Sequence, residues 1–359
     1  MKKHNFSAGP AILPLPVFEQ AAEAVREFND MGLSLLEISH RSPEFTAVLE
    51  EAQVLVRDLL QVPEDYAILF LQGGASSQFF MSAMNLLDDG ATAGYVDTGS
   101  WSDKAIKEAR LFGQVEVLAS SKDHHYTYIP KDYPIPEGLS YVHITTNNTI
   151  FGTQYKALPP ASTPLVADMS SDIFSKPVDV SRFDLIYAGA QKNLGPAGVT
   201  LVIVRKSALG KVKRAIPTML DYQTHIKKNS AFNTPPVYPI YVSMLTLRWI
   251  KANGGVAAMQ ERNAAKAGLI YQEIDRNPLF KGVVTDLTDR SAMNATFVLA
   301  DGQEGLAEEF LNMCAEANCT GVKGHRSVGG FRASMYNAME IESVQALVQV
   351  MKSLERKHG

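Results

Sequence analysis

The stretch YAGAQKNLGPAG, residues 187–198, places a single lysine among small residues where two apolar runs meet. Seven of its twelve residues are Gly, Ala or Pro, and Lys192 is its only cation. The flanking runs FDLIY (183–187) and VTLVIV (199–204) are typical of buried strands. Most lysines in loops are simply solvated, but the flanking strands and small neighbours disfavour that interpretation. A lysine in a tight site binds its proton less firmly and can act as a Schiff-base nucleophile or general base.

Short apolar runs alternate with amphipathic segments through the first two-thirds of the chain. The runs expected to form strands are 66–71, 91–99, 114–119, 139–146, 164–170, 183–190 and 199–204. Helical patterns occupy 76–87 and 102–113, between successive strands. This alternation predicts an α/β fold, with a large domain built on a mainly parallel sheet of the seven-stranded type flanked by helices. Such sheets bind ligands at the carboxyl ends of their strands.

The last third of the chain has a different pattern. Two long helical segments, 239–255 and 256–274, precede a strand at 294–300 and helices at 304–318 and 341–357, which predict a smaller α+β domain. We therefore expect three parts. They are an N-terminal segment (1–15) that packs with the small domain and the active site, a large domain (16–260) and a small C-terminal domain (261–359).

Composition narrows the class of protein. The chain has 359 residues, 46% of them hydrophobic and 20% charged, as in ordinary soluble proteins. A net charge of −4, with no Lys/Arg run, gives no reason to expect nucleic acid. No apolar run approaches the roughly 18 residues of a membrane span. Prolines interrupt the N-terminus before a signal-peptide core can form. With only two cysteines, a cytoplasmic location is expected.

Three further features fit a cofactor chemistry that uses Lys192. Asp168 lies near the end of the run 164–170; it could be a turn residue, but beside a Schiff-base lysine it suits the ring nitrogen of pyridoxal phosphate. The turn LQGGASSQFF (71–80) opens a helix whose N–H groups suit a phosphate, although it is neither a P-loop nor a dinucleotide fingerprint. Trp101 follows a strand and opens a helix; tryptophans are mostly packing residues, but this one is placed to stack on a pyridine ring.

Together these features resemble the class V branch of the aspartate-aminotransferase fold group, the fold type I pyridoxal-phosphate enzymes. The resemblance covers nearly the whole chain. Its most specific motifs are NFSAGPAILP (5–14), EISHRSPEF (37–45), QGGASSQF (72–79), NNTIFGTQ (147–154), ADMSSDIFS (167–175), YAGAQKNLGPAG (187–198), NTPPVYPIY (233–241) and KGHRSVGGFRASMYNA (323–338).

The resemblance implies a role for each matching residue. It makes Lys192 the Schiff-base partner of the cofactor, with Asp168 at the ring nitrogen, Trp101 stacked on the ring and Thr149 near the phenolic oxygen. Ala75, Ser76 and Gln191 would hold the cofactor phosphate. Asn233 and Thr234 would reach the phosphate of a neighbouring subunit's cofactor, which implies a homodimer with active sites at the subunit interface.

The arginines and histidines suggest an anionic substrate. The candidates are His40, Arg41, His325, Arg326 and Arg332, which form two His-Arg pairs and one further arginine. Most arginines lie on protein surfaces, but this many cations suit a carboxylate plus a phosphate. The resemblance implies that Arg332 takes the α-carboxylate and the two pairs take a phosphate or the distal carboxylate of glutamate.

The activity implied is reversible amino transfer from L-glutamate to 3-phosphohydroxypyruvate in serine biosynthesis, with 4-phosphohydroxythreonine of pyridoxine synthesis as a further substrate left open. Some relatives have an arginine at the position of Ser76. Alternatives are a transaminase acting on glyoxylate, a cysteine desulfurase that uses Cys319, and a catalytically inactive relative. The last is disfavoured because Lys192 and Asp168 are present. No motif for a metal site is found, so none is expected.

Overall fold

The computed structural model describes residues 3–160 and 163–359. Its central element is a seven-stranded sheet with the order β2-β8-β7-β6-β5-β3-β4. The strands are Tyr66–Leu71 (β2), Thr92–Asp97 (β3), Gln114–Ser120 (β4), Val142–Thr145 (β5), Leu165–Asp168 (β6), Phe183–Gly189 (β7) and Thr200–Arg205 (β8). Each of the seven apolar runs expected to form strands of the large domain is one of these, so the predicted α/β class is confirmed.

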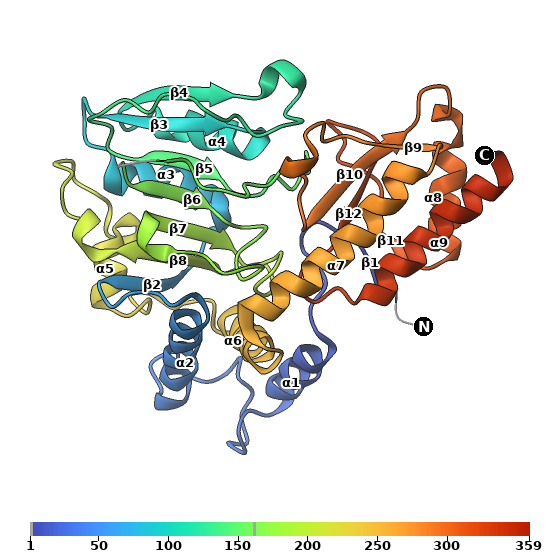
Figure 1. Ribbon diagram of the computed structural model, residues 1–359. Coiled ribbons are helices and arrows are strands. Elements are labelled where there is room, and N and C mark those ends of the chain that lie inside the picture. The colour runs from blue at the N-terminus through green and yellow to red at the C-terminus, as the bar shows by residue number, and fades with distance from the viewer. Residues whose placement is uncertain (1–2, 161–162) are drawn as a thin grey trace.

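The directions of the strands decide where the site lies. β8 runs antiparallel to both of its neighbours, and the other adjacent pairs are parallel. Thr145, Asp168 and Tyr187 lie side by side in the register of β5, β6 and β7. The carboxyl ends of these parallel strands therefore meet at one edge of the sheet, which faces the small C-terminal part of the molecule (Figure 1).

Helices cover both faces of this sheet because alternate strand residues point to opposite sides. In β2, Ile68 and Phe70 belong to one hydrophobic cluster, while Leu69 and Leu71 belong to the other. The first cluster includes residues of α1 (Leu15–Arg26), α2 (Pro43–Leu60) and α6 (Val237–Ala252), and the second includes α3 (Gly74–Leu86), α4 (Ser100–Ala109) and α5 (Tyr222–Lys227).

The helix predictions need two corrections. The sequence patterns did not predict α1 or α2. In addition, α4 ends at Ala109, four residues before the glycine that was expected to close it. The remainder of that predicted helix forms a turn in which the N–H of Phe112 donates to the carbonyl of Ala109.

The smaller α+β part has its own core. It contains α7 (Gly255–Arg276), α8 (Ala307–Glu316) and α9 (Ile341–His358), with an antiparallel sheet of β9 (Phe280–Gly282), β10 (Asn294–Leu299) and β12 (Phe331–Ser334). Phenylalanines from β9, β10, α8 and β12 pack against one another at its centre. β1 (His4–Asn5) pairs with β11 (Cys319–Thr320), which joins the N-terminal segment to this part.

One helix connects the two parts. Met259, near the start of α7, packs in the core of the large sheet, whereas Ala267, Ile270 and Ile274 pack in the smaller core. Figure 1 shows α7 running diagonally from the large part to the small one. The division between residues 260 and 261 stays a prediction. In the described parts of the chain, no helix is both long enough and apolar enough to cross a membrane.

Candidate active site

A cavity of about 280 Å³ lies at the carboxyl edge of the large sheet. Its wall combines residues that follow β5, β6 and β7 with the first turns of α3 and α4 and with residues of the small part. Nine of the predicted site residues line it: Ala75, Ser76, Trp101, Thr149, Asp168, Gln191, Lys192, His325 and Arg332. Their individual roles stay predictions, but the structure brings them together around one space.

Lys192 is the reactive amine of this cavity. It follows β7 in a tight turn, is only 9% exposed, and its Nζ donates a hydrogen bond to Thr149 Oγ1 at 2.7 Å. Burial lowers the pKa of Lys192 to about 8; the charge of Asp168 opposes this shift and the charge of Arg332 adds to it. Roughly a tenth of Lys192 is therefore a neutral, nucleophilic amine at pH 7, far more than for an ordinary lysine.

Asp168 is the buried carboxylate of the cavity. It is the last residue of β6, and its Oδ1 accepts a hydrogen bond from the N–H of Ser170 at 2.9 Å. Burial raises the pKa of Asp168, while the charge of Lys192 and the hydrogen bond from Ser170 lower it. A buried carboxylate with free acceptor capacity suits a protonated ring nitrogen, because that partner supplies both a charge and a hydrogen bond.

The first turn of α3 forms one end of the cavity. Gly73 precedes the helix with φ +95°, and a Cβ there would lie 2.0 Å from Ser77 Oγ. Ala75 and Ser76 belong to the first turn, where backbone N–H groups have no carbonyl one turn earlier to bond. Such N–H groups, at the positive end of the helix dipole, suit a phosphate.

Two residues of the cavity wall have side-chain donors without an acceptor among the described residues. The indole Nε1 of Trp101 and the Nε of Arg332 are buried without an acceptor. Arg332 also donates from Nη1 to the carbonyl of Thr149 at 3.1 Å, so Thr149 contacts both Arg332 and Lys192. The amine of Lys192, the carboxylate of Asp168 and the start of α3 match the aldehyde, ring nitrogen and phosphate of pyridoxal phosphate, respectively. Further polar groups are left for a substrate.

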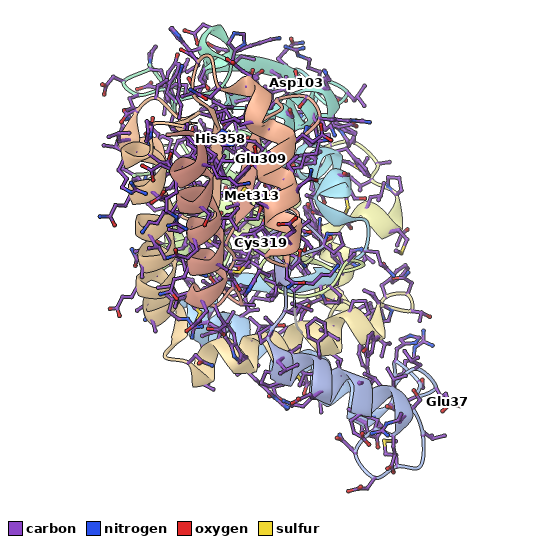
Figure 2. The ribbon with its side chains drawn as sticks, turned by 90° about the vertical axis from the view of Figure 1, so that its right-hand side faces the viewer. Glu37, Asp103, Glu309, Met313, Cys319 and His358 are labelled. Carbon is purple, nitrogen blue, oxygen red and sulfur yellow. The ribbon has the colours of Figure 1, made fainter. Side chains whose placement is uncertain are left out.

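Five predicted site residues do not line this cavity. His40 and Arg41 lie in the loop between α1 and α2, Asn233 and Thr234 precede α6, and Arg326 lies exposed beside His325. Figure 2 shows Glu37, from the same loop as Arg41, at the opposite end of the molecule from Asp103 in α4, the helix that carries Trp101. Within one chain, this loop therefore lies away from the cavity.

Sequence reasoning missed part of the wall. Ala8 and Gly9 line the cavity, and a Cβ at Gly9 would lie 3.2 Å from Cγ of Lys192. Ser170 also lines it, and its Oγ accepts a hydrogen bond from the N–H of Gly189. The motifs 5–14 and 167–175 include these residues, and the segment 1–15 was expected near the site. Only the fold shows which of their atoms face Lys192 and Asp168.

The cysteines do not belong to the site. Burial raises the pKa of Cys314 to about 12 and that of Cys319 to about 11, and neither thiol lines the cavity. Figure 2 shows Cys319 just beyond the C-terminal end of α8, where its side chain is buried in the core of the small part. A desulfurase needs a reactive thiolate at the cofactor, so this alternative has no support in the structure.

The fold and the site define a fold type I enzyme that uses pyridoxal phosphate, and comparison with known proteins gives the family. A model of the family described as aminotransferase class-V matches residues 3–347. The chain belongs to this family and is a pyridoxal-phosphate-dependent aminotransferase.

Two relatives and two solved structures that this chain resembles share one name. Phosphoserine aminotransferase of Phocaeicola vulgatus is 57% identical over 358 residues, which cover 100% of both chains. That of Flavobacterium johnsoniae is 58% identical over 358 residues, covering 99% of this chain and 100% of the relative. The solved structure of phosphoserine aminotransferase from Bacillus circulans subsp. alkalophilus matches with a TM-score of 0.96 and 48% identity, covering 100% of this chain and 99% of that one. Another, which describes radiation damage of the Schiff base in phosphoserine aminotransferase, has a TM-score of 0.95 and 49% identity, with 99% and 100% coverage.

Proposed function

We propose that the protein transfers the amino group of L-glutamate to 3-phosphohydroxypyruvate, giving O-phospho-L-serine and 2-oxoglutarate, the reaction that the names of its relatives imply. The observation that carries this proposal is the charge pattern of one cavity. Lys192 and Asp168 lie beside His325 and the cation Arg332, and Asp168 is the only acidic residue among the described residues that line it. A substrate with two anionic groups fits such a cavity.

The residues divide between cofactor and substrate. Pyridoxal phosphate supplies an electron sink for the bond broken at the substrate's Cα. Asp168 keeps its ring nitrogen protonated, Trp101 stacks on the ring, and Thr149 lies near the phenolic oxygen. Ala75, Ser76 and Gln191 hold the phosphate.

Lys192 serves both half-reactions as the proton carrier. Its amine would hold the cofactor at rest and, once free, would carry a proton to and from the substrate's Cα. One group must act as base and then as acid, which works best when its pKa is close to the working pH. The pKa of about 8 for Lys192 meets this requirement.

The substrate binds through its two anionic ends. Arg332, which already donates to Thr149 beside the amine, takes the α-carboxylate. His325, in the cavity wall, and the exposed Arg326 beside it take the phosphate or the distal carboxylate of glutamate.

The residues away from the cavity complete the neighbouring subunit's site in a homodimer. His40 and Arg41 add cations for the substrate's distal anion, and Asn233 and Thr234 reach the cofactor phosphate. The arrangement is supported by the exposed position of Arg41 and Thr234 and by the buried, unpartnered Nε2 of His40. The enzyme works in the cytoplasm, in serine biosynthesis, and accepts 4-phosphohydroxythreonine in pyridoxine synthesis through the same cations.

Amino transfer by the purified holoenzyme tests the proposal. With glutamate as donor, 3-phosphohydroxypyruvate should be strongly preferred over glyoxylate and pyruvate. Lys192→Ala should abolish transfer to every acceptor, whereas Arg41→Ala should reduce mainly the use of the phosphorylated one. Equal or better use of glyoxylate or pyruvate would contradict the proposed substrate while leaving the family unchanged. In the same assay, 4-phosphohydroxythreonine replaces glutamate as the amino donor, which tests its use as a further substrate.

A further inference from the structure

Helix α4 carries two lysines in different electrostatic situations. Lys107 Nζ forms an ion pair with Asp103 at 2.6 Å. Lys104 has no carboxylate within ion-pair distance among residues 3–160 and 163–359. Its Nζ instead lies 4.7 Å from the centre of the Trp101 ring. Asp103 is the immediate neighbour of Lys104 in the chain and faces another side of the helix, so it pairs with Lys107 and leaves Lys104 in contact with the Trp101 ring.

The ring on which Lys104 rests is part of the cavity wall. Trp101 lines the cavity together with His325 and Arg332. The charge of Lys104 reaches this group: the pKa of His325 is lowered first by burial and then by the charges of Arg332, Arg326 and Lys104. The charge of Lys104 therefore acts on His325, a residue of the cavity wall, and its ammonium contacts Trp101, another residue of that wall.

We propose that Lys104 is a specificity-determining residue, whose ammonium group favours a phosphorylated substrate over one with a carboxylate or no anion at the same end. This inference rests on the proposed function. An ammonium on a four-carbon stem acts as a mobile point charge, and its attraction to a dianion is about twice that to a monoanion at the same distance. Lys104 therefore discriminates by charge.

Neutralising Lys104 tests the inference, with Lys107 as the matched control on the same helix. For Lys104→Gln, kcat/KM for 3-phosphohydroxypyruvate should fall about fivefold, the size expected for one partly exposed charge pair. For glutamate it should fall about twofold, because the distal anion carries half the charge. Transfer to pyruvate, which has no distal anion, should be unchanged. Lys107→Gln should leave all three values unchanged, and Lys104→Arg should retain wild-type preference.

Salt separates a charge effect from a packing effect. At about 1 M salt the Debye length is about 3 Å, so the difference between wild type and Lys104→Gln should largely disappear. A packing defect would persist in salt and would alter the cofactor's visible spectrum or the melting temperature, which should both stay as in wild type. Equal losses for phosphorylated and unphosphorylated acceptors, or equal effects of the two glutamine variants, would overturn the inference. A wild-type enzyme without preference for the phosphorylated acceptor would instead contradict the proposed function.

Discussion

The pKa of the Lys192 amine is set by its burial and by two charged neighbours. Burial is the largest cause of its lowered pKa, because a charged ammonium loses hydration in the cavity. Arg332 lowers the pKa further by repulsion, and Asp168 raises it by attraction. The same two residues are expected to contact substrate and cofactor, so the residues that bind the ligands also tune the amine.

The pH dependence of cofactor binding by the apoenzyme measures this tuning. Only the neutral amine attacks the cofactor's aldehyde, so the association rate should rise with pH and level off above about 8, the pKa of Lys192. Arg332→Gln should move the midpoint to higher pH, because it removes a repelling charge. Arg326→Gln, which alters an exposed arginine that is not among the causes of the Lys192 shift, is the control. Stopped-flow absorbance would follow the reaction from pH 6 to about 10.5, which is close to the pKa of an ordinary lysine. A midpoint near that of an ordinary lysine would contradict the structure.

At the scale of elements, two helix starts place ligand groups at the edge of the sheet. α3 and α4 both begin directly after glycines with positive φ, +95° at Gly73 and +153° at Gly99. A Cβ at Gly99 would lie 2.4 Å from Asn148 Oδ1, in the loop that leads to Thr149. The absence of side chains at these two points lets strand, turn and helix approach closely enough to form the cavity.

Substitution of Gly73 tests the role of the α3 start. Gly73→Ala should weaken binding of pyridoxal phosphate to the apoenzyme by about tenfold or more, because the new methyl group displaces Ser77 and with it the first turn. Gly90→Ala is the matched control: its φ is +77°, but no atom lies within 4 Å of the added Cβ. Both variants should lose about 1 kcal/mol of stability through backbone strain. Fluorescence titration would give the affinities, and equal affinities for the two variants would contradict the assignment.

At the scale of the whole molecule, the predicted site residues of one chain do not all line one cavity. Lys192 and Arg332 line the cavity, whereas Arg41 is exposed on a distant loop. The homodimer that we propose resolves this separation, because the loop of one subunit completes the site of the other.

Mixing two inactive variants tests the shared site. Lys192→Ala and Arg41→Ala homodimers should each be impaired in the use of the phosphorylated acceptor. After the two are unfolded together in equal amounts and refolded, half of the dimers should be mixed, each with one intact site. Activity should then reach about a quarter of wild type, as random pairing of two-fold dimers requires. Mixing Lys192→Ala with Arg332→Gln, two residues of one cavity, is the control and should restore nothing. Failure of the first mixture to recover activity would show that Arg41 does not act across the interface.

Local patterns in the sequence were sufficient to predict most of the secondary structure. Each buried strand of the large sheet is a short apolar run, and a run of that kind has few other stable conformations. α1 and α2 were not predicted. Each begins at or next to a proline, and the segments that lead into them were recognised only as family motifs. Lys192, Asp168 and the turn at Gly73 were predicted because small or polar residues interrupt apolar runs there.

The sequence by itself therefore determined the α/β class and the seven strands of the large sheet, because these depend on residues near one another in the chain, and it predicted Lys192 and Asp168 as site residues. Only the tertiary structure decided the antiparallel direction of β8, the contact of Gly9 with Lys192, the placement of Arg332 beside Thr149, and the unpaired position of Lys104 at the cavity. Most of these features join segments up to 183 positions apart. No local pattern encodes such contacts, since they arise from the packing of the whole sheet against the small part.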